Sequence, residues 1–201
     1  MALTVSDLKD GLLAAFQSMT DGDDQTFADG VAAACKAYAE SGKVTTADAG
    51  IVSAGTFTGA GVGSISCDDA PCAQAIMTAC VALSNMPAGG DILLAAQLVM
   101  AIYSMLSAGE VNCVVAGTAI TPVGAPVALS GAAKGTLTGI PAPMLAAFSS
   151  AFQTMGDMTE GGDEYLAAQM AAAVDAYLKA AAAVTQGQGP LAGSVGAGAM
   201  A

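Results

Sequence analysis

The sequence contains no arginine, no histidine and no tryptophan, and its only basic side chains are five lysines. Without histidine, the chain has no imidazole for a Ser-His-Asp triad or for a histidine-ligated metal. Without arginine, it lacks the side chain that grips carboxylates and phosphates with two parallel hydrogen bonds. Five lysines are too few to neutralise the phosphates of a nucleic acid. The composition therefore excludes specific nucleic-acid binding.

The charge is unbalanced but sparse. Seventeen acidic side chains give a net charge of −12, yet only 11 % of the residues are charged and 54 % are hydrophobic. Disorder requires low hydrophobicity with a high charge density, so this composition predicts a folded chain. Its 201 residues correspond to about one to one and a half ordinary domains. The negative charge also opposes contact with DNA.

Five cysteines occur at irregular spacing: Cys35, Cys67, Cys72, Cys80 and Cys113. An odd, irregular set favours reduced and mostly buried thiols in a protein made in the cytosol. A disulfide between Cys67 and Cys72 is the main alternative. A zinc site would need a second pair of ligands, and no second cysteine pair and no histidine supplies one. We therefore predict no metal and no cofactor.

The strongest signal in the sequence is an internal repeat. The segments that begin at Pro71 and Pro143 match without a gap at a constant offset of 72 residues. Within them, Gly89-Gly90-Asp91 corresponds to Gly161-Gly162-Asp163. Alanine-rich sequences align by chance, but proline and Gly-Gly-Asp matches are not alanine matches. Such self-similarity indicates repeated structural units.

The N-terminal third of the chain joins the repeat. Ala32–Tyr38 resembles Ala171–Tyr177, and Val44-Thr45 then lines up with Val184-Thr185. Each copy has the pattern of a helix, an acidic or Gly-rich turn, a second helix and an extended Gly/Thr/Val segment. We therefore predict that the chain is a triplication.

The predicted fold class is mainly α. Three tandem helical hairpins pack together, because a single hairpin cannot bury its apolar face alone. The Gly/Thr/Val-rich segments between them are either short β-strands or ordered extended arms. The predicted units are residues 1–67, residues 68–138 and residues 139–201, and the last ends in a Gly/Ala-rich tail, Gly187 to Ala201, that is either mobile or ordered by a partner.

Two motifs suggest ligand sites but lack the required spacing. The acidic run Asp21–Asp24 does not have the alternating oxygens and terminal Glu of a calcium loop. We interpret it, with its counterparts Asp91 and Asp163, as a helix cap. The run Thr58–Gly63 lacks the lysine of a phosphate loop and the G-x-G-x-x-G spacing of a dinucleotide site. No catalytic, cofactor-binding or metal-binding residue is predicted, and we expect no enzymatic activity.

The apolar run Ile92–Ala108 raises the question of a membrane. Its seventeen residues reach only the lower limit for a transmembrane helix. Asp91 and Glu110 flank it, without lysines or an aromatic belt. A holin-like membrane hairpin is one alternative. We favour a helix in the middle of the bundle, with the second copy covered by the other two.

Parts of the first copy resemble a known class of proteins. The run Ala32–Tyr38, the K-V-T-T motif Lys43–Thr46 and the Gly-rich run Ala49–Ile65 are similar to small virion proteins of tailed bacteriophages. Those proteins are structural parts of the neck, tail or baseplate. The resemblance implies a component without catalysis that assembles in a ring or around a larger hub. The triplication departs from the single-copy form of that class.

Together, these observations predict a non-enzymatic structural protein of a tailed phage particle. It would be made in the host cytoplasm and reside in the virion as neck, tail or baseplate. It would act by self-assembly, as a homo-oligomer or ring, and by docking to other virion proteins, without a membrane. One alternative is a self-associating cellular or surface structural or adaptor protein, and a second is the holin-like membrane protein.

Overall fold

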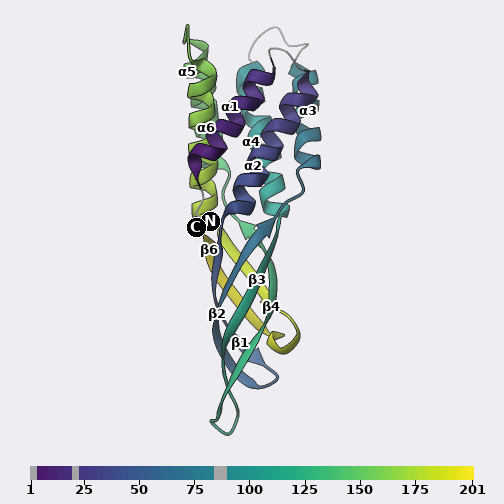
Figure 1. The fold of residues 1–201 in the computed structure, drawn as a ribbon, viewed down its shortest axis with the longest axis vertical. Helices are drawn as coiled ribbons and strands as arrows, with labels where there is room; N and C mark the ends of the chain where they lie inside the picture. The colour runs from purple at the N-terminus through teal and green to yellow at the C-terminus, as the bar shows by residue number, and fades with distance from the viewer. Residues whose placement is uncertain (1–3, 20–22, 84–89) are drawn as a thin grey trace.

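The chain folds into a bundle of helices that stands on an elongated β-barrel (Figure 1). The computed structural model describes residues 4–19, 23–83 and 90–201. The element order is αα-ββ repeated three times along the chain. The helices occupy one end of the molecule and the strands occupy the other, so the repeat runs back and forth along the long axis.

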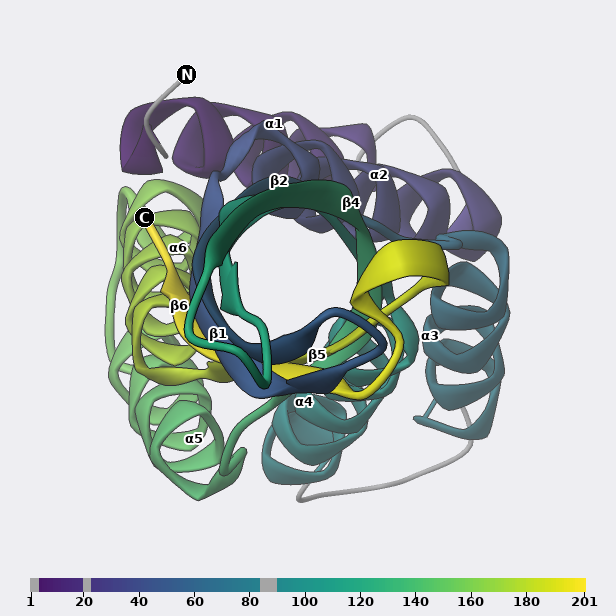
Figure 2. The same ribbon diagram turned by 90° about the horizontal axis from the view of Figure 1, so that it is seen from below.

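Six helices make up the bundle in the described residues: α1 (Val5–Ser18), α2 (Asp24–Ser41), α3 (Ala70–Leu83), α4 (Gly90–Ala108), α5 (Ala142–Gly156) and α6 (Gly162–Ala180). Their apolar side chains recur at helical spacing, as in α1, where Leu8, Leu12 and Phe16 are buried. This pattern gives each helix one inward face. The helices form a closed ring in chain order, with α6 packed back against α1 (Figure 2).

Six strands form the barrel: β1 (Val44–Val52), β2 (Gly55–Ser66), β3 (Glu110–Ile120), β4 (Pro126–Thr138), β5 (Ala182–Gly187) and β6 (Ser194–Met200). Every neighbouring pair is antiparallel, and β6 pairs with β1 to close the barrel. Closure satisfies the backbone groups of the extended segments without leaving an open sheet edge.

The mainly α prediction is therefore wrong. The extended segments are the strands of a single closed barrel, and the fold combines this barrel with the helix bundle. The prediction of a mobile or partner-ordered tail over residues 187–201 is also wrong, because Ser194–Met200 is β6 and closes the barrel between β1 and β5 of the same chain. Its backbone groups are paired on both sides, which fixes the end of the chain.

Each of the three expected units, 1–67, 68–138 and 139–201, contains two helices followed by two strands. All three contribute to the same barrel, since β2 pairs with β3, β4 with β5 and β6 with β1. The barrel is therefore shared, and the axis of its pseudo-threefold repeat passes through it.

The strand register shows how the copies correspond. At the three junctions between copies, Gly63 pairs with Cys113, Gly135 with Thr185 and Gly198 with Thr46. Thr46, Cys113 and Thr185 are thus equivalent residues. The offset of 139 that joins Tyr38 to Tyr177 also joins Thr46 to Thr185, so the alignment of Val44-Thr45 with Val184-Thr185 is displaced by one residue. In a strand, one residue moves a side chain to the opposite face.

The prediction of a central second copy is wrong as well. Helix α4 occupies one place in the ring, between α3 and α5, as its counterparts occupy theirs (Figure 2). Its inner face is fully buried at Leu98, Ile102 and Leu106, whereas Ile92 and Met100 are about half exposed on its outer face. The apolar outer face, rather than a central position, explains the long hydrophobic run.

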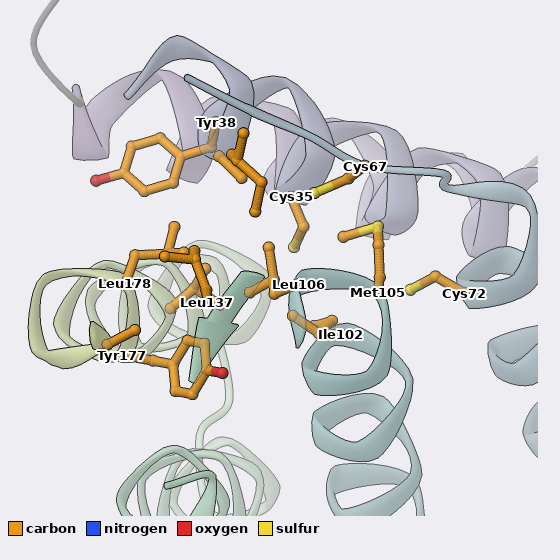
Figure 3. Packing of buried hydrophobic residues seen from close by; sticks show 14 of the residues in the cluster. Cys35, Tyr38, Cys67, Cys72, Ile102, Met105, Leu106, Leu137, Tyr177 and Leu178 are labelled. Atoms are coloured by element: carbon orange, nitrogen blue, oxygen red, sulfur yellow. The ribbon is translucent and has the colours of Figure 1, made fainter. Parts of the chain in front are cut away.

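The core continues from the bundle into the top of the barrel. Tyr38, Met105 and Tyr177 are equivalent residues on α2, α4 and α6, and Figure 3 shows them around the same layer of the core as Leu137 of β4. All of them are buried. The two tyrosines differ in one respect. The Tyr38 hydroxyl donates a 2.6 Å hydrogen bond to Asp175 Oδ1, whereas that of Tyr177 has no partner among the described residues.

This difference gives a matched pair of variants. Tyr38→Phe removes a hydrogen bond to a carboxylate and should lower the free energy of unfolding by about 2 kcal/mol. Tyr177→Phe removes a buried hydroxyl that has no protein partner, so it should leave stability unchanged or raise it. Urea unfolding of both variants measures the difference. Equal losses in the two variants would contradict the described pairing.

Candidate functional site: the barrel wall and the polar layer inside it

The barrel is narrow, and glycine makes it so. Six strands enclose less space than the eight that just accommodate ordinary side chains. Gly59, Gly61 and Gly63 all face inward from β2, where an added Cβ would overlap neighbouring atoms. The Phe57 ring lies over Gly59 and over Gly117 of β3. The Gly-rich run Thr58–Gly63 is thus part of a closely packed strand.

A polar layer crosses the middle of this interior. Thr46, Asp48 and Thr185 are at most 5 % exposed. Thr46 Oγ1 donates a 2.7 Å hydrogen bond to Asp48 Oδ2. The thiol of Cys113 borders the layer, and burial is the main cause that raises its pKa, with the charge of Asp48 adding to the effect. An acidic side chain is therefore buried inside the barrel.

Two atoms of this layer lack hydrogen-bond partners. Among the described residues, Asp48 Oδ1 and Thr185 Oγ1 are buried and make no hydrogen bond. Both lean over Gly196, whose strand β6 lies between β1 and β5, and either one would overlap a Cβ at that position. The two oxygens therefore converge on the space above one glycine.

The outer face of the barrel, here called the barrel wall, consists of the outward side chains of β1–β6. It carries large exposed apolar side chains, with Val114 71 % and Ile51 78 % exposed. The other large apolar residues on the wall are Val62, Ile120, Val184 and Val195. Between them lie mostly alanine, threonine and serine. Large exposed apolar side chains thus occur on five of the six strands of the wall.

The barrel wall is also nearly free of charge. Glu110 and Lys134 are its only charged residues, and they form an ion pair across β3 and β4. This pair lowers the pKa of Glu110, chiefly through its hydrogen bond from Lys134. All acidic residues other than Asp48 and Glu110 lie outside the strands. The negative charge is thus concentrated on the helical end, and the wall is neutral.

Two related grooves lie between neighbouring helices at the end of the bundle that adjoins the barrel. One of about 460 Å³ lies between α3 and α4, and one of about 530 Å³ lies between α5 and α6. Their linings correspond at the offset of 72, as in Pro71 with Pro143 and Met105 with Tyr177. Both are lined mainly by small and apolar residues. They are repeat features of the fold, and neither contains a cluster of titratable side chains.

The acidic motifs occupy helix starts, with corrections in detail. Asp23 is the N-cap of α2, and its side chain accepts hydrogen bonds from the backbone N–H and hydroxyl of Thr26 at 2.9 Å. These bonds, the backbone one first, lower the pKa of Asp23. Asp91 and Asp163 are first-turn residues of α4 and α6 rather than caps. Asp21 and Gly22 lie outside the described residues.

All five cysteines are free thiols, and four of them are buried. Cys67 and Cys72 are therefore not bridged. Burial raises the pKa of Cys67 to about 11 and that of Cys72 to about 12. In the native protein these thiols stay protonated at neutral pH and are hidden from solvent, so they are structural rather than reactive.

This burial predicts a thiol titration. A thiol reagent at pH 8 should modify native protein slowly, starting with the half-buried Cys80, and all five thiols should react at once after unfolding. The native pKa values of Cys67 and Cys72 lie above those of the unfolded chain. The stability that comes from burying these neutral thiols is therefore complete below pH 9 and decreases toward pH 11–12. Rapid modification of Cys67 or Cys72 in native protein would refute the packing.

One helix of the described residues, α4 (Gly90–Ala108), is long and apolar enough to span a membrane, with a mean hydropathy of 1.6. In the structure it packs in the ring of helices and contributes Leu98, Ile102 and Leu106 to the core. A buried core helix meets the same criterion of length and composition, so α4 carries no separate argument for a membrane.

Comparison with known proteins assigns no family. No protein-family model, no curated protein and no solved structure matches this chain. The function must therefore be argued from the sequence, the fold and its surfaces.

The barrel wall and the polar layer were not apparent from the sequence. Neither Asp48 nor Thr185 lies in a recognisable site motif, and Thr185 stood out only as part of the repeat. One signal was present: Asp48 is the only acidic residue in the strand-forming run from Val44 to Val52. Its inward direction follows from alternation with Val44 and Thr46, which is visible only once the run is assigned to a strand.

Proposed function

We propose that the protein is a non-enzymatic structural component of a tailed phage particle, in the neck, tail or baseplate. The observation that carries this proposal is the neutral, apolar barrel wall. An exposed face with valine and isoleucine and a single ion pair fits burial against another protein better than permanent contact with water. The choice of a tailed phage as the particle rests on the sequence resemblance to phage virion proteins.

The distribution of charge supports assembly through the barrels rather than through the helical ends. The helical end carries almost all the acidic residues, while the wall is neutral. Like charges repel at contact, so helical ends of neighbouring molecules would stay apart while barrels approach. The fixed, closed barrel presents a rigid surface, which reduces the entropy lost on docking. The partners are other virion proteins and further copies of this chain.

The experiment that tests this proposal is a protein inventory of purified particles. Particles are produced in a host that carries the gene, banded in a density gradient and analysed by mass spectrometry. The chain should be present in the banded particles in a fixed ratio to the other structural proteins. An infection protein that is not part of the particle serves as the control. Absence of the chain from intact particles would overturn the proposal.

A further inference from the structure

The polar layer inside the barrel contains one acidic side chain without a basic partner. Asp48 is 2 % exposed, and no lysine side chain of the described residues lies with it in the barrel interior. Its carboxylate receives one protein hydrogen bond, from Thr46 Oγ1 to Oδ2. A buried carboxylate without a partner cation costs several kcal/mol of stability. A cation in contact with the carboxylate would remove this cost.

The two oxygens without hydrogen-bond partners show where such a cation would lie. Asp48 Oδ1 and Thr185 Oγ1 are both buried without a partner in the described structure, and both overlap the position of a Cβ at Gly196. They can therefore contact one and the same small species. Glycine at position 196 lets both oxygens lie this close to β6, because a Cβ there would collide with both of them.

The repeat places this space near the axis of the barrel. Thr46, Cys113 and Thr185 are equivalent inward residues, one from each copy, each opposite a glycine of the next strand. Asp48 lies two residues along β1 from Thr46, where the other copies have Val115 and Gly187. Only one copy thus supplies a charge, and the other two supply neutral groups or space.

We propose that the barrel binds one monovalent metal cation between Asp48 Oδ1 and Thr185 Oγ1. Carboxylate and hydroxyl oxygens are ligands for hard cations. A single positive charge balances the single carboxylate, whereas a divalent ion would leave a buried positive charge. The bound cation would link β1 to β5 across β6. The proposal is independent of the proposed role in a phage particle.

Thermal unfolding in different salts tests the site. The protein is dialysed into NaCl, KCl or tetramethylammonium chloride at equal ionic strength, the last cation being too large to enter the barrel. The midpoint should be higher by at least about 3 °C in NaCl or KCl, because a ligand that binds only the folded state stabilises it. Asp48→Asn should melt at one temperature in all three salts. Glu110→Gln, which removes an exposed acid of the barrel wall, should keep the difference.

A second measurement keeps the proposal falsifiable if Asp48→Asn does not fold. A crystal of the unchanged protein grown with thallium(I), a monovalent cation, should show an anomalous scattering peak that contacts Asp48 Oδ1 and Thr185 Oγ1. Thr185→Val should weaken this peak. A water molecule or an empty space there in thallium(I), or equal melting of the unchanged protein in the three salts, would overturn the proposal.

Discussion

Replacing Gly135 by alanine should unfold the barrel. A Cβ at this position of β4 would overlap the backbone carbonyl oxygen of Val184 and lie 2.7 Å from Thr185 Cα. Backbone of a paired strand cannot move aside as a flexible side chain does, so strands β4 and β5 would have to separate. We expect a loss of about 4 kcal/mol or more, which is a large part of the stability of an ordinary domain.

The repeat predicts the same result at two further positions. Gly63 and Gly198 are equivalent to Gly135, and an added Cβ would meet the backbone of the adjacent strand in the same way. Gly156→Ala at the end of α5 is the control, because no heavy atom lies within 4 Å of its added Cβ. Alanine there should leave stability unchanged or slightly higher.

Circular dichroism during heating measures the melting temperatures of the three barrel variants and of the Gly156→Ala control. The Gly135, Gly63 and Gly198 variants should melt at least about 10 °C below the unchanged protein or be recovered only as insoluble material, while Gly156→Ala stays soluble. A soluble Gly135→Ala variant with the unchanged melting temperature would mean that β4 and β5 do not pair in this register.

Val114→Glu is expected to abolish assembly without harming the fold. Val114 projects from β3 into solvent, with 71 % of its surface exposed, so a charge there costs the free chain little. In an assembly that covers the barrel wall, the same carboxylate would be buried without a partner. We expect the concentration needed for assembly, or for partner binding, to rise at least about tenfold.

Ile92→Glu provides the matched control. Ile92 is a 50 % exposed apolar residue near the start of α4, at the helical end of the molecule. The substitution adds the same charge to a different surface. Sedimentation velocity over a range of concentrations compares the two variants. If Ile92→Glu disrupts assembly and Val114→Glu does not, the interface lies on the helices rather than on the barrel wall.

The helices were predictable because their signal is local. Apolar side chains such as Leu8, Leu12 and Phe16 recur at helical spacing, and this pattern survives without knowledge of the partner elements. Repeat matches that include proline and Gly-Gly-Asp also lie within contiguous segments. The repeat and its helical pairs could therefore be recognised from the sequence, although which helix occupied the centre could not.

The barrel was missed because its strands carry apolar residues on both faces and glycines among the inward ones. In an ordinary half-buried strand, large apolar residues face inward and polar ones outward. In β2, Phe57 and Ile65 face inward, but so do the glycines at 61 and 63, while Val62 between them is 47 % exposed. The narrow middle of the interior demands small residues, and the wall carries apolar ones. The last strand, Ser194–Met200, follows the same rule with glycines at 196 and 198 facing inward. Its composition therefore suggested a loose tail.

The polar layer depends on contacts between distant parts of the chain. Asp48 and Thr185 belong to the first and third copies, and they converge only because β6 lies between β1 and β5. A one-residue error in the alignment of Thr45 with Thr185 moves one partner to the outer face. Barrel closure, which no local pattern encodes, is thus the step that creates both the wall and the site.

The central claim is that this molecule builds assemblies through its barrel, and native mass spectrometry of the purified chain, alone and mixed with proteins from dissociated particles, tests it most directly. The account predicts a defined oligomer or a stoichiometric complex with a particle protein, and Val114→Glu should remove that species. A chain that remains a monomer at every concentration and binds none of the particle proteins would contradict the account.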